Sequence, residues 1–337
     1  MILRRSWWLV CFSWLVWSFA PSCLAEARAS EEKTGEEKAK TSTPEVTLEA
    51  PTGKYIRLIR DDKGRPLELQ TAIVRFVADD EVHKGLEVDL VAAVHIGETS
   101  YYEELNKQFG GYDALLYELV APEGTRVPKG GAKSDHPVSR LQTGMKNLLD
   151  LDFQLDHVDY QSKNFVHADM SPDSFSKSMN ERGESIWALV FRMLGQSLAE
   201  QNKGEKSVDA ELLLALFDKN RALALKRVLA EQFEDLEGMM SAFNGPDGST
   251  LITERNKRAL EVLGKEIGSG KKRLAIFYGA GHMPDMARRL IADFKLKPAS
   301  ESWVTAWDLH DAARKGKSKP AKEGKPKREK AATADEE

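Results

Sequence analysis

Two histidines follow apolar runs that have the composition of buried strands. His95 follows the run in "DLVAAVHIG", and His282 is the last residue of "LAIFYGAGH", after Gly279 and Gly281. Short apolar runs bounded by glycine are typical of strands buried on both faces. In open α/β sheets, ligands bind beyond the carboxyl ends of the strands. We therefore expect both histidines at one edge of a sheet, where the glycines let the backbone approach a ligand closely.

A carboxylate interrupts a third apolar run. Glu118 lies in "ALLYELV", which is otherwise apolar and ends before Pro122. A buried carboxylate is costly unless a cation or hydrogen-bond donors neutralise it. A divalent metal shared with His95 and His282 would do so, and imidazole and carboxylate ligands together suit manganese, cobalt or zinc. Pairing with Arg255, or exposure at a sheet edge, would satisfy Glu118 as well.

Two further polar groups are candidates for the substrate-binding part of this site. "ITERNKRAL" places Glu254, Arg255 and Asn256 at the start of a helix, where the planar guanidinium could hold a substrate oxygen. The alternative is a charged first turn in which Glu254 complements the helix dipole. His167 and Asp169 in "FVHADMS" either lie on the rim of the site or serve the structure, with Asp169 capping a turn.

Alternating strands and helices must position these residues. Strands are predicted over 71–78, 88–96, 114–120, 273–278 and 301–309, and helices over 99–109, 253–267 and from Pro284 through Leu290. This order predicts an α/β fold with a mainly parallel central sheet and flanking helices. A helical insertion over about 183–245 has core periodicity and either covers the site or serves only as packing.

The N-terminal segment 1–25 has the pattern of a secretory signal peptide. Arg4 and Arg5 precede an apolar run, and small residues follow it. The run is shorter than the roughly 20 residues that a transmembrane helix needs. We therefore predict an exported protein, periplasmic or extracellular, whose mature chain begins near Glu26 or Arg28. The alternative is an uncleaved anchor that keeps the protein at a membrane.

Two polar segments flank one folded domain, which we place at 48–312. Residues 26–47 are mostly Ala, Glu, Lys, Ser and Thr, which predicts a disordered linker. Residues 313–337 form a lysine-rich tail that is either solvated or in electrostatic contact with an anionic surface. The net charge of −4 predicts no nucleic-acid partner. Both cysteines, Cys11 and Cys23, lie in the leader, so the exported chain would have neither disulfide nor thiolate ligand.

Four stretches together resemble the TraB/PrgY/GumN family, which is related to the Tiki metalloproteases. They are "AAVHIG", "YDALLYELV", "ITERNKRALEVL" and "LAIFYGAGHMPDM", in that order over most of 88–290. The family has two G-x-x-H motifs, a glutamate on the strand after the first, and an E-R-N helix before the second. Here the second motif is complete from Gly279 to His282, whereas Ala92 replaces the glycine of the first.

The resemblance implies an α/β fold related to erythromycin esterase and to haem-binding ChaN-like proteins. For Tiki relatives it implies peptide cleavage that depends on a divalent metal, with manganese or cobalt favoured. For many bacterial relatives it implies no settled activity.

We therefore predict an exported metal-dependent hydrolase that acts on an amide of a peptide or protein substrate. His95, Glu118 and His282 would hold the ion and meet within about 8 Å, because ligand bonds are roughly 2 Å long. Glu118 would be the general base if it is not a ligand, and Arg255 would stabilise the oxyanion or anchor the substrate. One alternative is a non-catalytic protein that captures a peptide signal or haem, which Ala92 favours. Another is a metal-free esterase with a histidine and Glu118 as general base.

Overall fold

The computed structural model describes residues 53–78, 80–81, 83–128, 144, 146, 148–185, 208–233 and 248–311. The predicted signal peptide, linker and lysine-rich tail lie outside the described residues, as do 186–207 and 234–247 of the predicted helical insertion. No helix among the described residues is long and apolar enough to cross a membrane.

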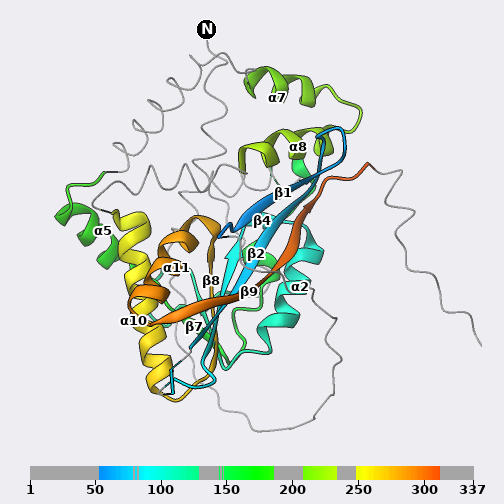
Figure 1. The fold of residues 1–337 in the computed structure, drawn as a ribbon. Coiled ribbons are helices and arrows are strands. Elements are labelled where there is room, and N and C mark those ends of the chain that lie inside the picture. The colour runs from blue at the N-terminus through cyan, green and yellow to red at the C-terminus, as the bar shows by residue number, and fades with distance from the viewer. Residues whose placement is uncertain are drawn as a thin grey trace, which may run out of the picture.

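The central sheet combines a parallel and an antiparallel half (Figure 1). Its strands are β1 Ile56–Arg60, β2 Pro66–Ala78, β3 Glu87–Ala93, β5 Ala114–Tyr117, β7 Phe165–His167, β8 Arg273–Gly279 and β9 Leu296–Asp308. They lie in the order β1, β2, β3, β8, β5, β7, and β9 pairs with β2 outside this path. β3, β8, β5 and β7 are parallel neighbours, whereas β1, β3 and β9 all pair with β2 in antiparallel fashion.

The predicted α/β class is confirmed, but the sheet is less parallel than the sequence indicated. The strand predicted over 71–78 belongs to β2, which extends from Pro66 to Ala78 and is separated from β3 by only eight residues, 79–86. So short a connection permits only antiparallel pairing, because a parallel pair needs a crossover of a dozen or more residues. The strand predicted over 301–309 corresponds to the end of β9, which begins earlier, at Leu296, ends at Asp308, and pairs along the other edge of β2.

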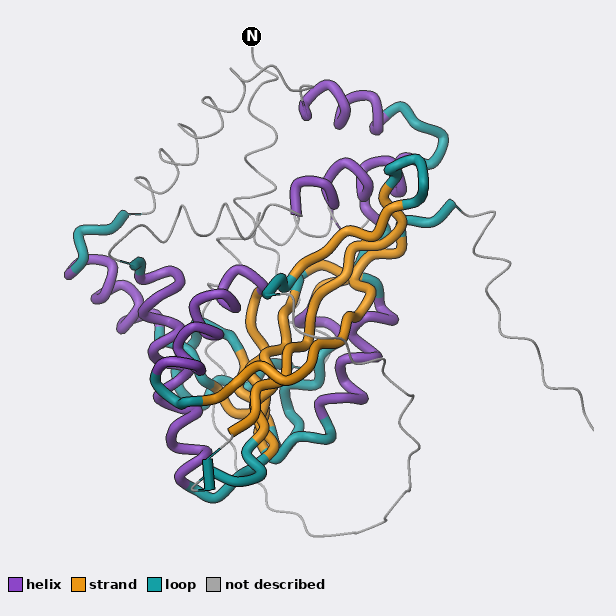
Figure 2. The backbone as a smooth tube through the Cα atoms, viewed as in Figure 1, coloured by secondary structure: helices purple, strands orange, loops and turns teal. Residues whose placement is uncertain are grey.

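Helices cover both faces of the parallel half (Figures 1 and 2). α2 (Thr99–Phe109) connects β3 to β5, whereas α11 (Met283–Ala292) connects β8 to β9 in the opposite direction across the sheet. Since crossovers between parallel strands are right-handed, these two connections place their helices on opposite faces. α10 (Arg255–Gly268) packs beside α11, and its buried Leu260 and Leu263 have the spacing of an amphipathic helix.

The last parallel strand lies between the first two. β3 and β5 form the predicted strand–helix–strand unit, but β8 occupies the position between them. Ala93 of β3 pairs with Gly279 of β8, and Tyr117 of β5 pairs with both Phe277 and His167. The carboxyl ends of the four strands are therefore nearly level, so the segments that follow them meet at one edge of the sheet.

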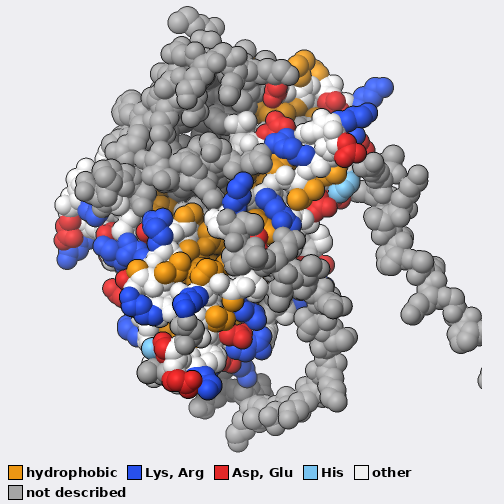
Figure 3. Space-filling view, in the orientation of Figure 1, with side chains coloured by type: hydrophobic (Ala, Val, Ile, Leu, Met, Phe, Trp, Pro, Cys, Tyr) orange, Lys and Arg blue, Asp and Glu red, His pale blue; other side chains and the backbone are white. Residues whose placement is uncertain are grey.

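The described part of the helical insertion packs on the antiparallel half. α8 (Arg221–Phe233) contacts β1 and β2, and its buried Lys226 places Nζ 2.8 Å from Glu98 Oε1. The ring of Phe233 lies 5.2 Å from that of Trp307 in β9. α7 (Val208–Leu216) is more peripheral: hydrophobic side chains in its last turn and just after it are exposed, most of all Phe217 at 88%. Hydrophobic atoms are visible on the surface at the upper right of Figure 3. In the described residues, α8 therefore packs on β1 and β2 and reaches Glu98, three residues after His95.

Candidate functional site

Five candidate residues meet at the carboxyl edge of the parallel strands. Glu118 directly follows β5, Asp169 follows β7, and His95 follows β3. His282 ends η3 (Ala280–His282), which continues from β8, and Arg255 begins α10. All but His95 are buried, and His95 is partly exposed.

Gly279 marks the point on which three of these side chains converge. A Cβ built on Gly279 would lie 3.3 Å from Glu118 Oε2, 3.7 Å from His95 Nε2 and 3.9 Å from His282 Cδ2. Because all three atoms lie within 4 Å of one point, no two of them are as much as 8 Å apart. The predicted convergence is confirmed. The Gly279 N–H also donates to Glu118 Oε2 at 2.7 Å, so this glycine does allow a close backbone approach.

The Glu118 carboxylate is paired with Arg255. Arg255 Nη2 lies 2.7 Å from Glu118 Oε1 and 2.6 Å from Asp169 Oδ2, while its Nε donates to Asp169 Oδ1 at 3.0 Å. The side chains are 1%, 6% and 0% exposed for Arg255, Glu118 and Asp169. The guanidinium is thus enclosed between two carboxylates, which is the pairing the sequence allowed as an alternative.

This pairing determines the charge state of Glu118. Burial alone would raise the pKa of Glu118, but the charge of Arg255, with smaller contributions from His282, His95 and the Gly279 N–H, lowers it to about 2. Burial likewise opposes the charge of Arg255, but Asp169 and Glu118 raise its pKa above its usual value. Two buried carboxylates and one guanidinium therefore leave one net negative charge in this cluster.

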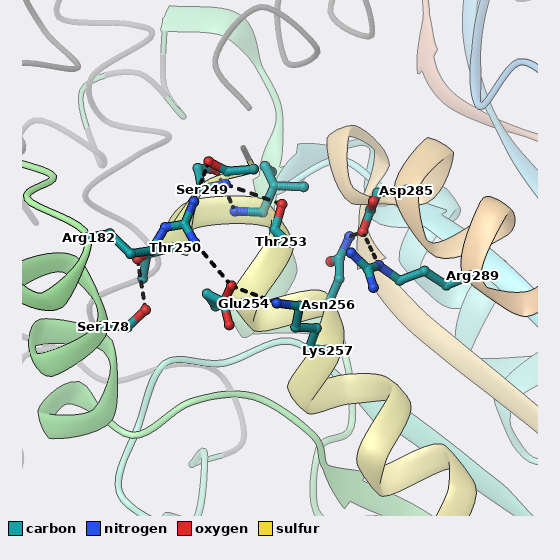
Figure 4. Close-up of polar contacts among 12 residues, drawn as sticks. Ser178, Arg182, Ser249, Thr250, Thr253, Glu254, Asn256, Lys257, Asp285 and Arg289 are labelled. Atoms are coloured by element: carbon teal, nitrogen blue, oxygen red, sulfur yellow. Dashed lines mark hydrogen bonds and ion pairs between the residues drawn. The ribbon is translucent and has the colours of Figure 1, made fainter. Parts of the chain in front are cut away.

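Asn256 orients the imidazole of His282. Its Nδ2 donates to Asp285 Oδ2 at 2.9 Å and to the His282 carbonyl at 3.2 Å, so its Oδ1 faces His282 Nδ1 at 2.7 Å. Figure 4 shows Asn256 between α10 and Asp285 of α11. An amide oxygen can only accept, so Nδ1 carries the proton and Nε2 presents its lone pair. Nε2 lies 3.6 Å from Glu118 Oε1, and burial lowers the pKa of His282 to about 4.

Gln154 holds the second imidazole in the same way. The side chain of Gln154 in α4 (Gln154–His157) donates to the Tyr160 hydroxyl at 2.7 Å, and its Oε1 lies 3.2 Å from His95 Nδ1. The Gln154 backbone N–H also donates to the His95 carbonyl at 2.9 Å. Burial lowers the pKa of His95, which keeps it neutral near pH 7. Gln154 and Tyr160 were not predicted from the sequence, because a polar residue in a segment without clear periodicity carries no signal of its partner.

A short antiparallel ribbon brings Gln154 to His95. β4 (Ile96–Gly97) pairs with β6 (Asp152–Phe153), with Ile96 opposite Phe153 and Gly97 opposite Asp152. The ribbon joins the residues directly after His95 to those directly before Gln154. The two side chains are therefore tied through both their backbones and their polar tips.

The other three sequence candidates lie beside the cluster and make different contacts. His167 Nε2 bonds to the Leu119 carbonyl at 2.6 Å, and its ring lies 5.6 Å from that of Tyr117. Glu254 Oε1 is 2.9 Å from Lys257 Nζ and 3.4 Å from Arg182 Nη1, on the outer side of α10 (Figure 4). Gly281 lies within η3. Asp169 is also no rim residue, because it is buried against Arg255.

A π-helical turn sets the start of α10. η2 (Thr250–Glu254) immediately precedes Arg255, and the Ser249 side chain caps it by accepting from the Ile252 N–H. The Thr250 N–H donates to the carboxylate of Glu184, and Arg182 Nη2 donates to the Gly248 carbonyl at 2.7 Å. Figure 4 shows Ser178 of α5 (Pro172–Glu181) beside Thr250 of η2, with their hydroxyl oxygens 2.9 Å apart. Single π turns recur at functional sites, and here one aims Arg255 and Asn256 into the cluster.

The donor chemistry of the site fits a divalent cation. His95 Nε2 and His282 Cδ2 lie within 4 Å of one point, and His282 Nε2 lies 3.6 Å from Glu118 Oε1. An amide bonds to each Nδ1 atom, and metal-bound histidines have such an outer partner in most cases. The net negative charge beside them also favours a cation. Within the described ranges, however, no group of three or more His, Cys, Asp or Glu side chains could hold a metal ion as it stands. The two oxygens of Glu118 already accept from Arg255 and Gly279.

Comparison of the chain with protein-family models, with curated proteins and with solved structures gives no match.

Proposed function

We propose that this protein is an exported metal-dependent hydrolase that cleaves a peptide amide. The observation that carries the proposal is the paired arrangement of His95 and His282. Each imidazole has Nδ1 bound to a carboxamide oxygen, and each directs its other edge towards Gly279 beside Glu118. The choice of a peptide substrate, of manganese, cobalt or zinc, and of export to the periplasm or the extracellular space rests on the sequence.

His95 and His282 would be the nitrogen ligands, and Glu118 the carboxylate. A divalent ion bound there would polarise a carbonyl oxygen and lower the pKa of a bound water towards about 7. The buried cluster supports this assignment electrostatically. Glu118 and Asp169 carry two negative charges against the single positive charge of Arg255, and His282, with its pKa of about 4, adds no charge at neutral pH.

The pKa of Glu118 bears on how the residues divide the chemistry. A carboxylate with a pKa of about 2 is a weak proton acceptor, and general bases work best with a pKa near the operating pH. We therefore assign Glu118 to charge and ligation, and not to general-base catalysis. Arg255 holds Glu118 in place from within the core, so we assign it as a positioning residue and no longer as the group that binds substrate.

A metal-free hydrolase is a second candidate, and one observation favours it. Both oxygens of Glu118 already accept hydrogen bonds, from Arg255 and from the Gly279 N–H, and this takes up part of the carboxylate's capacity to ligate a metal. In a metal-free hydrolase, the Glu118 carboxylate would interact electrostatically with the imidazole of His282, whose Nε2 lies 3.6 Å from Glu118 Oε1. The partly exposed His95 would then be the proton acceptor.

Metal content and cleavage measured together test the proposal. The mature protein would be purified without a polyhistidine tag, analysed for bound metal, and assayed against a peptide library with chelator and after adding back manganese, cobalt or zinc. Cleavage that disappears with chelator and returns with one ion supports the metal-dependent hydrolase. Cleavage that survives chelator supports the metal-free alternative, and no cleavage with any ion argues against a hydrolase.

His282→Ala sharpens that result. We expect this substitution to abolish metal-dependent cleavage and to remove the stabilisation that added metal gives in thermal unfolding. If metal shifts the unfolding of wild type and variant equally, His282 is not a ligand.

A further inference from the structure

We infer that Gln154 is the positioning residue that holds His95 with its proton on Nδ1, and that the hydroxyl of Tyr160 keeps the Gln154 amide in that orientation. The inference deepens the proposed function, on which its metal-binding consequence rests. Its statement about the His95 tautomer does not depend on any activity.

The contacts form a chain with a defined direction. The Gln154 Nε2 donates to the Tyr160 hydroxyl at 2.7 Å, which turns Oε1 towards His95 Nδ1 at 3.2 Å. Burial raises the pKa of Tyr160, so its hydroxyl stays neutral. An amide oxygen accepts and cannot donate, so the imidazole must supply the proton from Nδ1.

The surroundings of Gln154 leave little freedom for another arrangement. Gln154 is buried, at 4% exposed, and Tyr160 is 7% exposed against the ring of Tyr117 at 5.1 Å. The Gln154 backbone N–H donates to the His95 carbonyl. The two residues after His95 also pair with the two residues before Gln154 in the β4–β6 ribbon. A buried glutamine with both ends of its amide engaged, one on a site histidine, fits a positioning role better than general packing.

The role has a precedent within the same site. Asn256 performs it for His282 through the same atoms, an amide oxygen on Nδ1, although it comes from a different element, α10. Two unrelated segments thus supply a carboxamide to two histidines that face one point. Outer hydrogen bonds of this kind orient a ligating imidazole and raise its basicity.

Three substitutions test the role of Gln154. Gln154→Leu removes the amide at similar size, Gln154→Asn withdraws it by one methylene, and Gln154→Glu keeps an acceptor on Nδ1. Gln161→Leu is the matched control, because Gln161 is exposed and its side-chain amide donates to the Val127 carbonyl. Thermal unfolding shows whether each variant is folded. If Gln154→Leu does not fold, the test uses Gln154→Asn in its place.

The first readout is the tautomer of His95 in metal-free protein, from long-range nitrogen–proton NMR spectra assigned with a His95→Gln variant. We expect Nδ1 protonation in wild type, Gln154→Glu and Gln161→Leu, and loss of that preference in Gln154→Leu and Gln154→Asn. A His95 tautomer that is unchanged in both of these variants overturns the inference.

The second readout is the affinity for Mn²⁺, Co²⁺ and Zn²⁺ by titration calorimetry. We expect Gln154→Leu to bind about 10- to 100-fold more weakly than wild type, and Gln161→Leu to bind equally. If wild type binds a metal and Gln154→Leu binds it as tightly, the inference is overturned. If wild type binds none while the tautomer responds as expected, the positioning role of Gln154 stands and the metal-dependent function fails.

Discussion

The two histidines of the site are held by the same device in two different environments. His282 is buried, and its amide partner Asn256 is itself fixed by the charged Asp285. His95 is partly exposed, and its partner Gln154 is fixed by the neutral hydroxyl of Tyr160. The His282 side therefore belongs to a buried ionic core, whereas the His95 side belongs to a neutral ribbon at the edge of the site.

Although His95 and His282 have the same proposed role in binding, their surroundings therefore need not contribute equally to the free energy of unfolding. Around His282, the loss of one charge leaves other buried charges uncompensated, which is strongly destabilising. Around His95, the loss of a neutral hydrogen bond costs less, because it leaves no buried charge without a partner. We expect the His282 side to support the fold and the His95 side to be the more adaptable face towards substrate.

The largest effect should follow from removing the cation of the ionic core. We predict that Arg255→Leu lowers the free energy of unfolding by about 3–5 kcal/mol, because Glu118 and Asp169 would remain buried without a partner. Urea unfolding at neutral pH measures this. Arg258→Leu, three residues further along α10 and paired with Glu261 at the surface, should cost no more than about 1 kcal/mol. A similar small loss for Arg255→Leu would show that the core is not the stabilising side.

The pH dependence of the free energy of unfolding should come mainly from the His282 side of the site. The pKa of His282 falls from its usual 6.5 to about 4 on folding, so between these values the unfolded chain binds the proton and the folded chain does not. Stability should therefore fall as pH drops from 6.5 to 4, by up to about 1.4 kcal/mol per pH unit. The lowered pKa of Glu118, from 4.5 to about 2, extends the loss to lower pH.

Unfolding of chelator-treated protein between pH 7 and pH 4.5 checks this prediction. His282→Gln should flatten most of the slope, since glutamine does not titrate. His95→Gln should flatten it less, because His95 is the more exposed of the two. Equal effects of the two substitutions would remove the contrast between the sides.

A smaller effect on stability is expected at the point between the two histidines. Gly279→Ala places a methyl group 3.3 Å from Glu118 Oε2 without straining the backbone, whose φ of −52° suits any residue. We predict a change in unfolding free energy within about 1 kcal/mol, together with weaker metal binding. Gly264→Ala, in an open position of α10, should instead stabilise by about 0.4–1 kcal/mol and leave metal binding unchanged. Unaltered metal binding in Gly279→Ala would contradict the proposed location of the ion.

The smallest effect is expected at Ala92, where the first motif departs from the family pattern. Ala92 lies inside β3, fully buried and paired with Tyr278, one residue before the end of the strand. We predict that Ala92→Gly costs about 0.5–1 kcal/mol, the ordinary loss for glycine in a strand, and changes neither metal affinity nor cleavage. A clear gain in either would show that the His95 side is limited by this residue.

Much of the fold could be read from local pattern. The apolar runs before His95 and His282 became β3 and β8, and the amphipathic stretches became α2, α10 and α11. The antiparallel half could not be predicted in the same way. β2 pairs with β3 across the short connection 79–86, and with β9, which comes from the far end of the chain. Position 118 was identified as a buried carboxylate in need of a cation, and its partner proved to be Arg255.

The sequence by itself determined which residues would stand at strand ends, because burial on both faces demands apolar runs and glycine interrupts them. Only the tertiary structure decided that β8 inserts between β3 and β5, which brings His282, His95 and Glu118 around Gly279. It also decided the tasks of Asn256 and Gln154. A hydrogen bond depends on distances between atoms of segments far apart in the chain, and such distances leave no periodic trace in the order of residues.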